Sequence, residues 1–107
     1  MEVKNNMSEI DRDDKIRATI LAKLHREGFY KPRGVAVDTA ASFGIASHNR
    51  GRAKELIRSM AESDQYPVEY RNFKKSVYLK QESASWVASS IRRHYGDEAV
   101  PWDIRDL

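Results

Sequence analysis

The 107-residue chain contains no cysteine. This absence excludes a disulfide framework, every metal site built on thiolates, and cysteine as a catalytic nucleophile. It is typical of a protein in a reducing, intracellular compartment. Residues 1–14 contain no apolar run that could serve as a signal peptide, and no stretch of the chain approaches the roughly 20 apolar residues of a membrane span. We therefore expect a cytoplasmic protein that makes no contact with a membrane.

The sequence patterns of catalysis are lacking as well. The chain has no glycine-rich phosphate loop, no nucleophile elbow and no pair of acids in a recognisable catalytic setting. Its three histidines, His25, His48 and His94, fall on different predicted helices, and none has a second ligand at metal-site spacing. We expect no enzyme activity, no metal, no cofactor and no small-molecule ligand.

The chain does have a composition suited to folding and an uneven distribution of charge. Hydrophobic residues make up 40% of it, which is enough for the core of one compact domain. The formal net charge is +3, but residues 15–81 carry fourteen basic and six acidic side chains, whereas the flanking segments 1–14 and 82–107 are both net acidic. A polyanionic partner would be drawn to the central segment.

Hydrophobic periodicity and turn residues predict a mainly helical chain with one hairpin. Apolar residues recur at helical spacing in several segments, and they alternate with polar residues on both sides of the basic stretch "RNFKKS". Asp38 and Ser47 are placed to cap helices, and Gly44 and Gly96 to end them. The predicted elements are a helix over 15–27, a short strand over 35–37, a helix over 39–43, a helix from 47 to about 61, a hairpin over 67–81 and a helix over 83–95.

The segment "TAASFGIAS" (39–47) has the pattern of a helix-turn-helix. Small Ala40 can lie where two helices cross, Gly44 occupies the turn, and Phe43 and Ile45 flank the turn toward the core. A basic helix and a basic-tipped hairpin follow, and the order of elements over about residues 13–81 resembles the winged helix-turn-helix superfamily.

This resemblance implies an α+β, mainly α fold. It consists of a three-helix core, a short strand and a two-stranded β-hairpin wing, with an additional C-terminal helix packed on the domain or at a dimer interface. The expected organisation is a flexible N-terminal segment over 1–12, the winged helix-turn-helix domain over 13–81, the C-terminal helix over 82–96 and an acidic tail over 97–107.

The helix over 47–61 is amphipathic, and at about 100° per residue its face opposite the apolar one is basic. Arg50 stands where the superfamily often has an apolar residue, so packing is expected to begin only at Ala53. The resemblance implies that this helix enters the major groove of duplex DNA and that the wing, residues 71–76, touches the backbone or the minor groove. The residues predicted to share the buried arc are Ala53, Leu56, Ile57 and Met60.

The candidate DNA-binding residues lie in the helix over 47–61, in the connector over 29–34, which precedes the helix over 39–43, and in the wing. They are His48, Asn49, Arg50, Gly51, Arg52, Lys54 and Arg58 in the helix, Lys31 and Arg33 in the connector, and Arg71, Lys74 and Lys75 in the wing. Three alternatives stay open: a solvated basic helix face, a wing whose lysines only discourage edge pairing, and a connector without a binding role.

Gly51 stands between two of these arginines, although glycine is a weak helix former. Two explanations remain open. In the first, the missing side chain lets the helix backbone approach a groove wall or a phosphate. In the second, the helix proper begins only at Arg52 and "SHNRG" is an irregular lead-in.

The last predicted helix carries Trp86 and Arg93 on the face opposite its apolar stripe. Either this surface forms a homodimer interface together with Trp102, or the tail folds over the helix so that the two tryptophans cover each other.

We expect a small, DNA-associated transcriptional regulator that binds double-stranded DNA, sequence-specifically or architecturally, and forms a homodimer through its C-terminal helix. Two alternatives are kept. One is a winged-helix protein-protein interaction module, and the other is an RNA-binding protein, which is favoured if Phe73, Tyr70 and Tyr78 are exposed enough to stack on bases.

Overall fold

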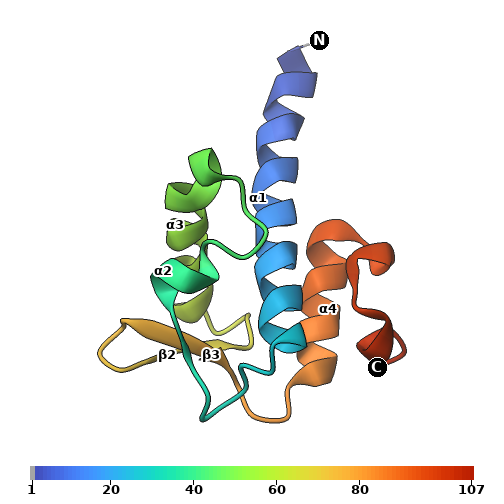
Figure 1. Ribbon diagram of the computed structural model, residues 1–107. Coiled ribbons are helices and arrows are strands. Elements are labelled where there is room, and N and C mark those ends of the chain that lie inside the picture. Colours follow the sequence, from blue (N-terminus) through green and yellow to red (C-terminus); the bar gives the residue numbers. More distant parts are fainter. Residues whose placement is uncertain (1) are drawn as a thin grey trace.

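The computed structural model describes residues 2–107, with side-chain surroundings from Arg12 onward. Within this part of the chain the fold is mainly helical α+β, as predicted (Figure 1). Its order of helices, short strand and hairpin is compatible with a winged helix-turn-helix. The elements are α1 (Glu2–Arg26), β1 (Val35–Ala36), α2 (Val37–Ala40), a 3-10 turn (Ser47–Asn49), α3 (Arg50–Ala61), β2 (Val68–Arg71), β3 (Ser76–Leu79), α4 (Ala84–Tyr95) and two C-terminal 3-10 turns (Asp97–Ala99 and Trp102–Ile104).

The three strands form an antiparallel sheet in the order β1-β3-β2. Val77, in the central strand, is opposite Val35 on one side and Tyr70 on the other, and Val68 is opposite Leu79. Because side chains alternate between the two faces of a strand, this register directs Val68, Val77 and Leu79 into the core, where all three are buried. The predicted alternation of the hairpin is confirmed.

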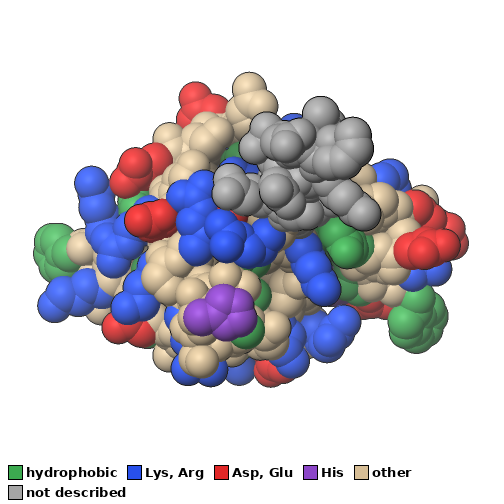
Figure 2. All heavy atoms as spheres, turned by 90° about the horizontal axis from the view of Figure 1, so that it is seen from above, with side chains coloured by type: hydrophobic (Ala, Val, Ile, Leu, Met, Phe, Trp, Pro, Cys, Tyr) green, Lys and Arg blue, Asp and Glu red, His purple; other side chains and the backbone are tan. Residues whose placement is uncertain are grey.

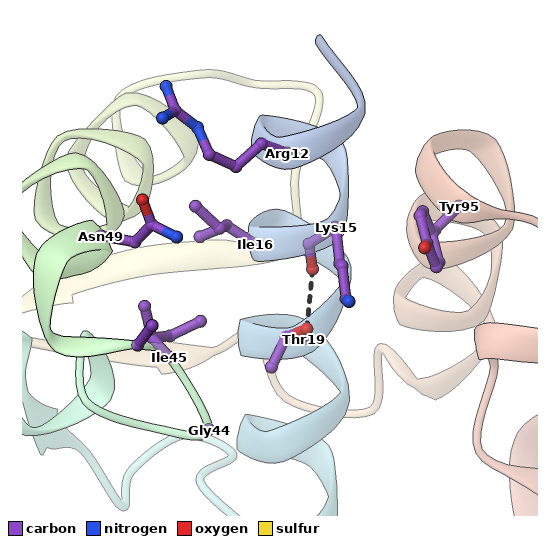
Figure 3. A pocket seen from close by; sticks show the side chains of 9 residues that line it. Arg12, Lys15, Ile16, Thr19, Gly44, Ile45, Asn49 and Tyr95 are labelled. Atoms are coloured by element: carbon purple, nitrogen blue, oxygen red, sulfur yellow. Dashed lines mark hydrogen bonds between the residues drawn. The ribbon is translucent and has the colours of Figure 1, made fainter. Parts of the chain in front are cut away.

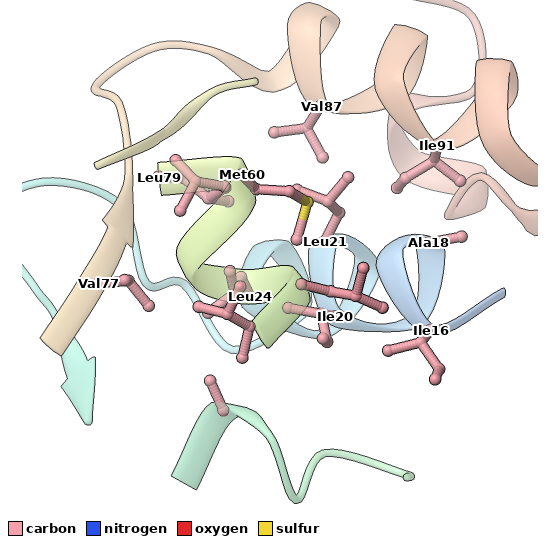
Figure 4. Close-up of a cluster of buried hydrophobic side chains, with 14 of the residues drawn as sticks. Ile16, Ala18, Ile20, Leu21, Leu24, Met60, Val77, Leu79, Val87 and Ile91 are labelled. Carbon is pink, nitrogen blue, oxygen red and sulfur yellow. The ribbon is translucent and has the colours of Figure 1, made fainter. Parts of the chain in front are cut away.

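Helix α1 lies at the centre of the molecule and packs against α3 on one side and α4 on the other (Figure 1). Ile20, Leu21 and Leu24 of α1 are fully buried, and they meet Met60 of α3 and Ile91 of α4 in one cluster (Figure 4). Burial of each such side chain contributes roughly 1.5–3 kcal/mol. The core therefore holds the hairpin and all three longer helices in one body.

The N-terminal helix is longer than predicted. The sequence predicts a flexible segment over 1–12 and a helix from Lys15, whereas α1 begins at Glu2. Residues 2–14 contain neither proline nor glycine, so nothing in the local sequence interrupts a helix there. As a consequence, Asp13 and Asp14 lie inside α1 and do not cap its start.

The turn region also differs in detail from the prediction. Asp38 was expected to cap a helix over 39–43, but α2 spans Val37–Ala40, so Asp38 lies inside its first turn. Gly44 has φ +62°, the left-handed conformation expected of it. Ser47 was expected to cap the next helix. It instead begins a 3-10 turn without a side-chain capping bond, and α3 starts at Arg50.

The C-terminal segment returns over α1 and α4 and contributes to the core. Val100 and Ile104 are buried, and Arg92 of α4 donates to Asp97 Oδ1 at 2.9 Å and to the Arg105 carbonyl oxygen at 2.7 Å. The predicted acidic tail is thus packed against the domain. Among the described helices, none combines the length and the apolar character needed to cross a membrane.

Candidate nucleic-acid interface

Helix α3 separates a buried face from an exposed one as predicted. Packing begins at Ala53, while Arg50 and Gly51 are exposed, and a Cβ placed on Gly51 would meet no other atom within 4 Å. The backbone at Gly51 is already helical, so the explanation in which the helix begins only at Arg52 is wrong. The buried residues of α3 are Ala53, Leu56, Ile57 and Met60.

Arg52 is held by two carboxylates of its own chain. It donates from Nε to Asp13 Oδ1 at 3.1 Å and from Nη2 to Asp13 Oδ2 at 2.7 Å, and its Nη1 donates to Glu55 Oε1 at 2.9 Å. The bond from Arg52 lowers the pKa of Asp13, although the partial burial of this carboxylate opposes the shift. Arg52 is therefore directed toward α1 in the free protein.

Lys54 is paired in a similar way. Its Nζ lies 2.9 Å from Asp38 Oδ1, and this hydrogen bond lowers the pKa of Asp38. Asp38 thus links α2 to α3 through its side chain, which is a role that the sequence did not reveal. Two of the predicted DNA contacts, Arg52 and Lys54, are neutralised by carboxylates from other helices.

The residues just before α3 are split between two surfaces. His48 is exposed. Asn49 is half-buried and points toward α1, where it lines a cavity of about 350 Å³ together with Arg12, Ile45 and Tyr95 (Figure 3). Asn49 is therefore directed away from the exposed face of α3.

Three cations meet at the hairpin tip, residues 71–76. Arg58 of α3 lines a hollow of about 460 Å³ together with Lys74 and Lys75, and Phe73 and Asp38 also border it. Among the side chains of residues 12–107, no carboxylate forms a salt bridge with any of these three cations. Lysine and arginine side chains are prominent on the side of the molecule where α3 and the hairpin lie, interspersed with acidic ones (Figures 1 and 2).

Arg71 and the connector cations belong to a neighbouring surface. The register places Arg71 on the sheet face opposite the core, where its Cδ would lie 2.9 Å from a Cβ on Gly34. Arg33 stacks over the Phe29 ring at 4.9 Å, and the Lys31 amide bonds to the Leu79 carbonyl at 2.8 Å. Arg71 therefore lies on the outer face of the sheet, whereas Arg33 lies beside Phe29, near the end of α1.

The tyrosines beside the hairpin tip are engaged within the chain. Tyr70 donates to Glu62 Oε2 at 2.9 Å, and Lys74 Nζ lies 5.7 Å from the centre of its ring. Tyr78 is half-buried, whereas Phe73 is 94% exposed. Of the three aromatic residues considered for stacking on bases, only Phe73 offers a free ring.

The residues of the expected dimer interface make contacts within the chain. Trp86 donates to the Gln65 carbonyl at 3.3 Å under Lys80, whose Nζ lies 4.7 Å from its ring centre. Arg93 donates to the same carbonyl at 3.4 Å. Trp102 is 84% exposed. The alternative in which Trp86 and Trp102 cover each other is wrong, because Trp102 is exposed and Trp86 instead contacts Gln65 and Lys80.

Two of the histidines connect α1 to the C-terminal part of the chain. His25 Nδ1 lies 2.9 Å from the Tyr30 hydroxyl and its Nε2 lies 2.9 Å from Asp103 Oδ2. His94 Nε2 lies 2.6 Å from the Tyr66 hydroxyl, and its Nδ1 lies 3.0 Å from Asp14 Oδ1. Burial lowers the pKa of His94, while Asp14 acts in the opposite direction.

Within the described part of the chain, no group of three or more histidine, aspartate or glutamate side chains is arranged to hold a metal ion. Comparison with protein-family models, with curated proteins and with solved structures finds no match for this chain.

Proposed function

We propose that this chain is a winged helix-turn-helix protein that binds double-stranded DNA, as a small transcriptional regulator. The observation that carries the proposal is the convergence of Arg58, Lys74 and Lys75 around one hollow. Asp38 also borders it but pairs with Lys54, and none of the three cations forms a salt bridge with a described carboxylate. Positive charges that form no salt bridge with a described carboxylate are suited to bind phosphates. Arg50 and His48, exposed at the start of α3, are then placed to reach base edges in the major groove.

The two paired cations of α3 are also proposed to contact DNA, after their internal ion pairs open. Arg52 and Lys54 have partly exposed pairs with Asp13 and Asp38. Exposed ion pairs contribute little to stability, so a phosphate can replace a carboxylate at small cost. We infer that these two cations exchange their internal partners for phosphates when DNA binds.

The remaining candidates have lesser roles in the proposal. Arg71, on the outer face of the sheet, and Lys31 and Arg33, in the connector after α1, can contact phosphates that flank the main site. Asn49 faces the cavity beside α1 and is not part of the proposed contact surface.

The test is a measurement of duplex affinity against salt concentration. Each phosphate contact contributes a slope of about −0.9 in log K against log salt, so the double variant Lys74→Gln/Lys75→Gln is expected to flatten the slope by about 1.8. The matched control is Lys23→Gln/Lys80→Gln, which removes the same charge away from the hairpin tip and should leave the slope nearly unchanged. Wild-type affinity without any salt dependence would refute the proposal, and so would equal slopes for the two double variants.

A second candidate function is self-association through the C-terminal segment. It is favoured by Trp102, which is 84% exposed although Ile104, two residues further on, is buried and Asp103 is held by His25. A large apolar ring presented on an anchored turn is typical of an interface. Light scattering on wild type and Trp102→Ala tests it: a dimer is expected for wild type and a monomer for the variant, and a monomeric wild type would exclude the interface.

A further inference from the structure

The hairpin tip adopts an uncommon backbone conformation. Asn72, Phe73 and Lys74 are consecutive and have φ values of 61°, 57° and 68°. This left-handed region disfavours residues with a Cβ, and a bulky residue such as Phe is uncommon there. Strained backbone that persists in a folded protein is found preferentially at functional sites.

The conformation is anchored at the base of the tip. The Lys75 amide donates to the Asn72 carbonyl at 3.2 Å, which closes the turn. The Val37 amide donates to the Lys75 carbonyl at 3.0 Å, which joins the turn to the start of α2. The hairpin tip is thus tied to the helix-turn-helix part of the fold and presents Phe73 from a defined position.

Phe73 does not contribute to the core. Its side chain is 94% exposed, whereas the apolar residues Val68, Val77 and Leu79 of the same hairpin are buried. The exposed ring adds no hydrophobic stabilisation to the folded chain. It stands on a left-handed turn beside three cations, and this combination suits contact with a partner. Lys74 and Lys75 follow it directly, and with Arg58 they border the hollow beside the ring.

We propose that Phe73 is a wedge that enters between two stacked base pairs of duplex DNA from the minor groove, while Lys74 and Lys75 hold the adjacent phosphates. An apolar side chain inserted in this way unstacks one base step and kinks the duplex, by roughly 20–90° in architectural DNA-binding proteins. This inference rests on the proposed DNA binding and adds to it a mode of contact. It places the protein among the DNA-binding proteins that bend the duplex.

The experiment compares wild type with Phe73→Ala and Phe73→Trp on a short duplex labelled at both ends for energy transfer. Wild type is expected to shorten the end-to-end distance, and Phe73→Ala to abolish the shortening and weaken binding about tenfold, because one stacking contact is lost. Phe73→Trp is expected to retain both effects. The salt slope should be the same for all three, since no charge changes.

A duplex with one central mismatch sharpens the test. A mismatched step is already partly unstacked, so wild type should bind it more tightly than the matched duplex, whereas Phe73→Ala should not distinguish the two. Phe73 lies outside the core, so unchanged thermal unfolding of Phe73→Ala is the control for folding.

The outcomes separate the wedge from the proposed function. If Phe73→Ala binds and bends the duplex as wild type does, the wedge is overturned while DNA binding stands. If wild type does not bind duplex DNA at all, both fail. If the ring matters only for single-stranded RNA, the wedge is overturned in favour of base stacking on an RNA partner.

Discussion

Replacement of Gly51 by alanine is expected to stabilise the protein and weaken its binding to DNA. Gly51 is the second residue of α3, its backbone is helical, and an added Cβ would meet nothing within 4 Å. Alanine therefore fits the folded state without strain and restricts the unfolded chain. Such substitutions stabilise by about 0.4–1 kcal/mol.

The stabilisation corresponds to a measurable shift in melting temperature. An unfolding entropy of about 2.1 cal/mol/K per residue over the whole chain predicts a rise of about 2–4 °C for Gly51→Ala. The matched control is Gly44→Ala. The nearest atom to its new Cβ, Thr19 Cγ2, is 3.6 Å away, so space is available, but φ is +62°. This variant should lose about 1 kcal/mol and melt several degrees lower.

The effect on binding has the opposite sign. If the outer face of α3 approaches the groove closely at Gly51, a side chain there forces the two surfaces apart, and overpacking of a tight contact costs about 1–3 kcal/mol. Duplex affinity should fall at least about fivefold for Gly51→Ala and further for Gly51→Gln. Calorimetry measures the first effect and fluorescence anisotropy with a random duplex the second.

Two results would refute this reasoning. A lower melting temperature for Gly51→Ala would mean that Gly51 is a turn residue whose backbone needs glycine. Unchanged affinity for both Gly51 variants would mean that this part of α3 does not meet DNA.

Three further predictions address the ion pairs, the histidines and the core. Asp38→Asn should raise duplex affinity a few-fold, because it frees Lys54 and removes a charge beside the hollow that repels phosphates. The control Asp106→Asn, near the C-terminus, should change the affinity little. Fluorescence anisotropy measures both affinities. The lowered pKa of His94 means that the unfolded chain takes up the proton first as pH falls. The free energy of unfolding should therefore be highest above pH 6.5, the ordinary pKa of histidine, and should decrease as the pH falls below it. Between pH 7.5 and 5.5 this decrease, measured by urea unfolding, should be smaller for His94→Gln. Leu24→Ala, at a fully buried site of α1, should lose about 2–5 kcal/mol in the same assay, and a loss below 1 kcal/mol would contradict the described core.

The local pattern of the sequence was sufficient for most of the secondary structure. The buried arc of α3 and the alternation of the hairpin depend on side-chain spacing alone, and both are confirmed. Gly44 and Gly96 have the positive φ values expected of residues that end helices. The start of α1 was missed because the sequence from residue 2 to 14 has weak apolar periodicity, although it contains no residue that breaks a helix.

The candidate site was less predictable, because the state of each cation depends on partners that are distant in the sequence. Arg52 and Asp13 are 39 residues apart, and they meet only because α1 packs against α3. Helical spacing predicted that Arg52 and Lys54 belong to a basic face of α3, but it could not show that carboxylates of α1 and α2 pair with them. It likewise could not show that Arg58 joins Lys74 and Lys75 at one hollow.

The mainly helical class, the faces of α3 and the hairpin, and the basic character of the central segment follow from the sequence alone, because periodicity, turn residues and charge are local properties. Tertiary packing determines which of the predicted cations form salt bridges with the described carboxylates. It also determines that Trp86 is half-buried while Trp102 is exposed, and that Phe73 projects from a strained turn. Those features depend on which helices and strands come into contact, and contacts between distant segments are set by the packing of the whole core.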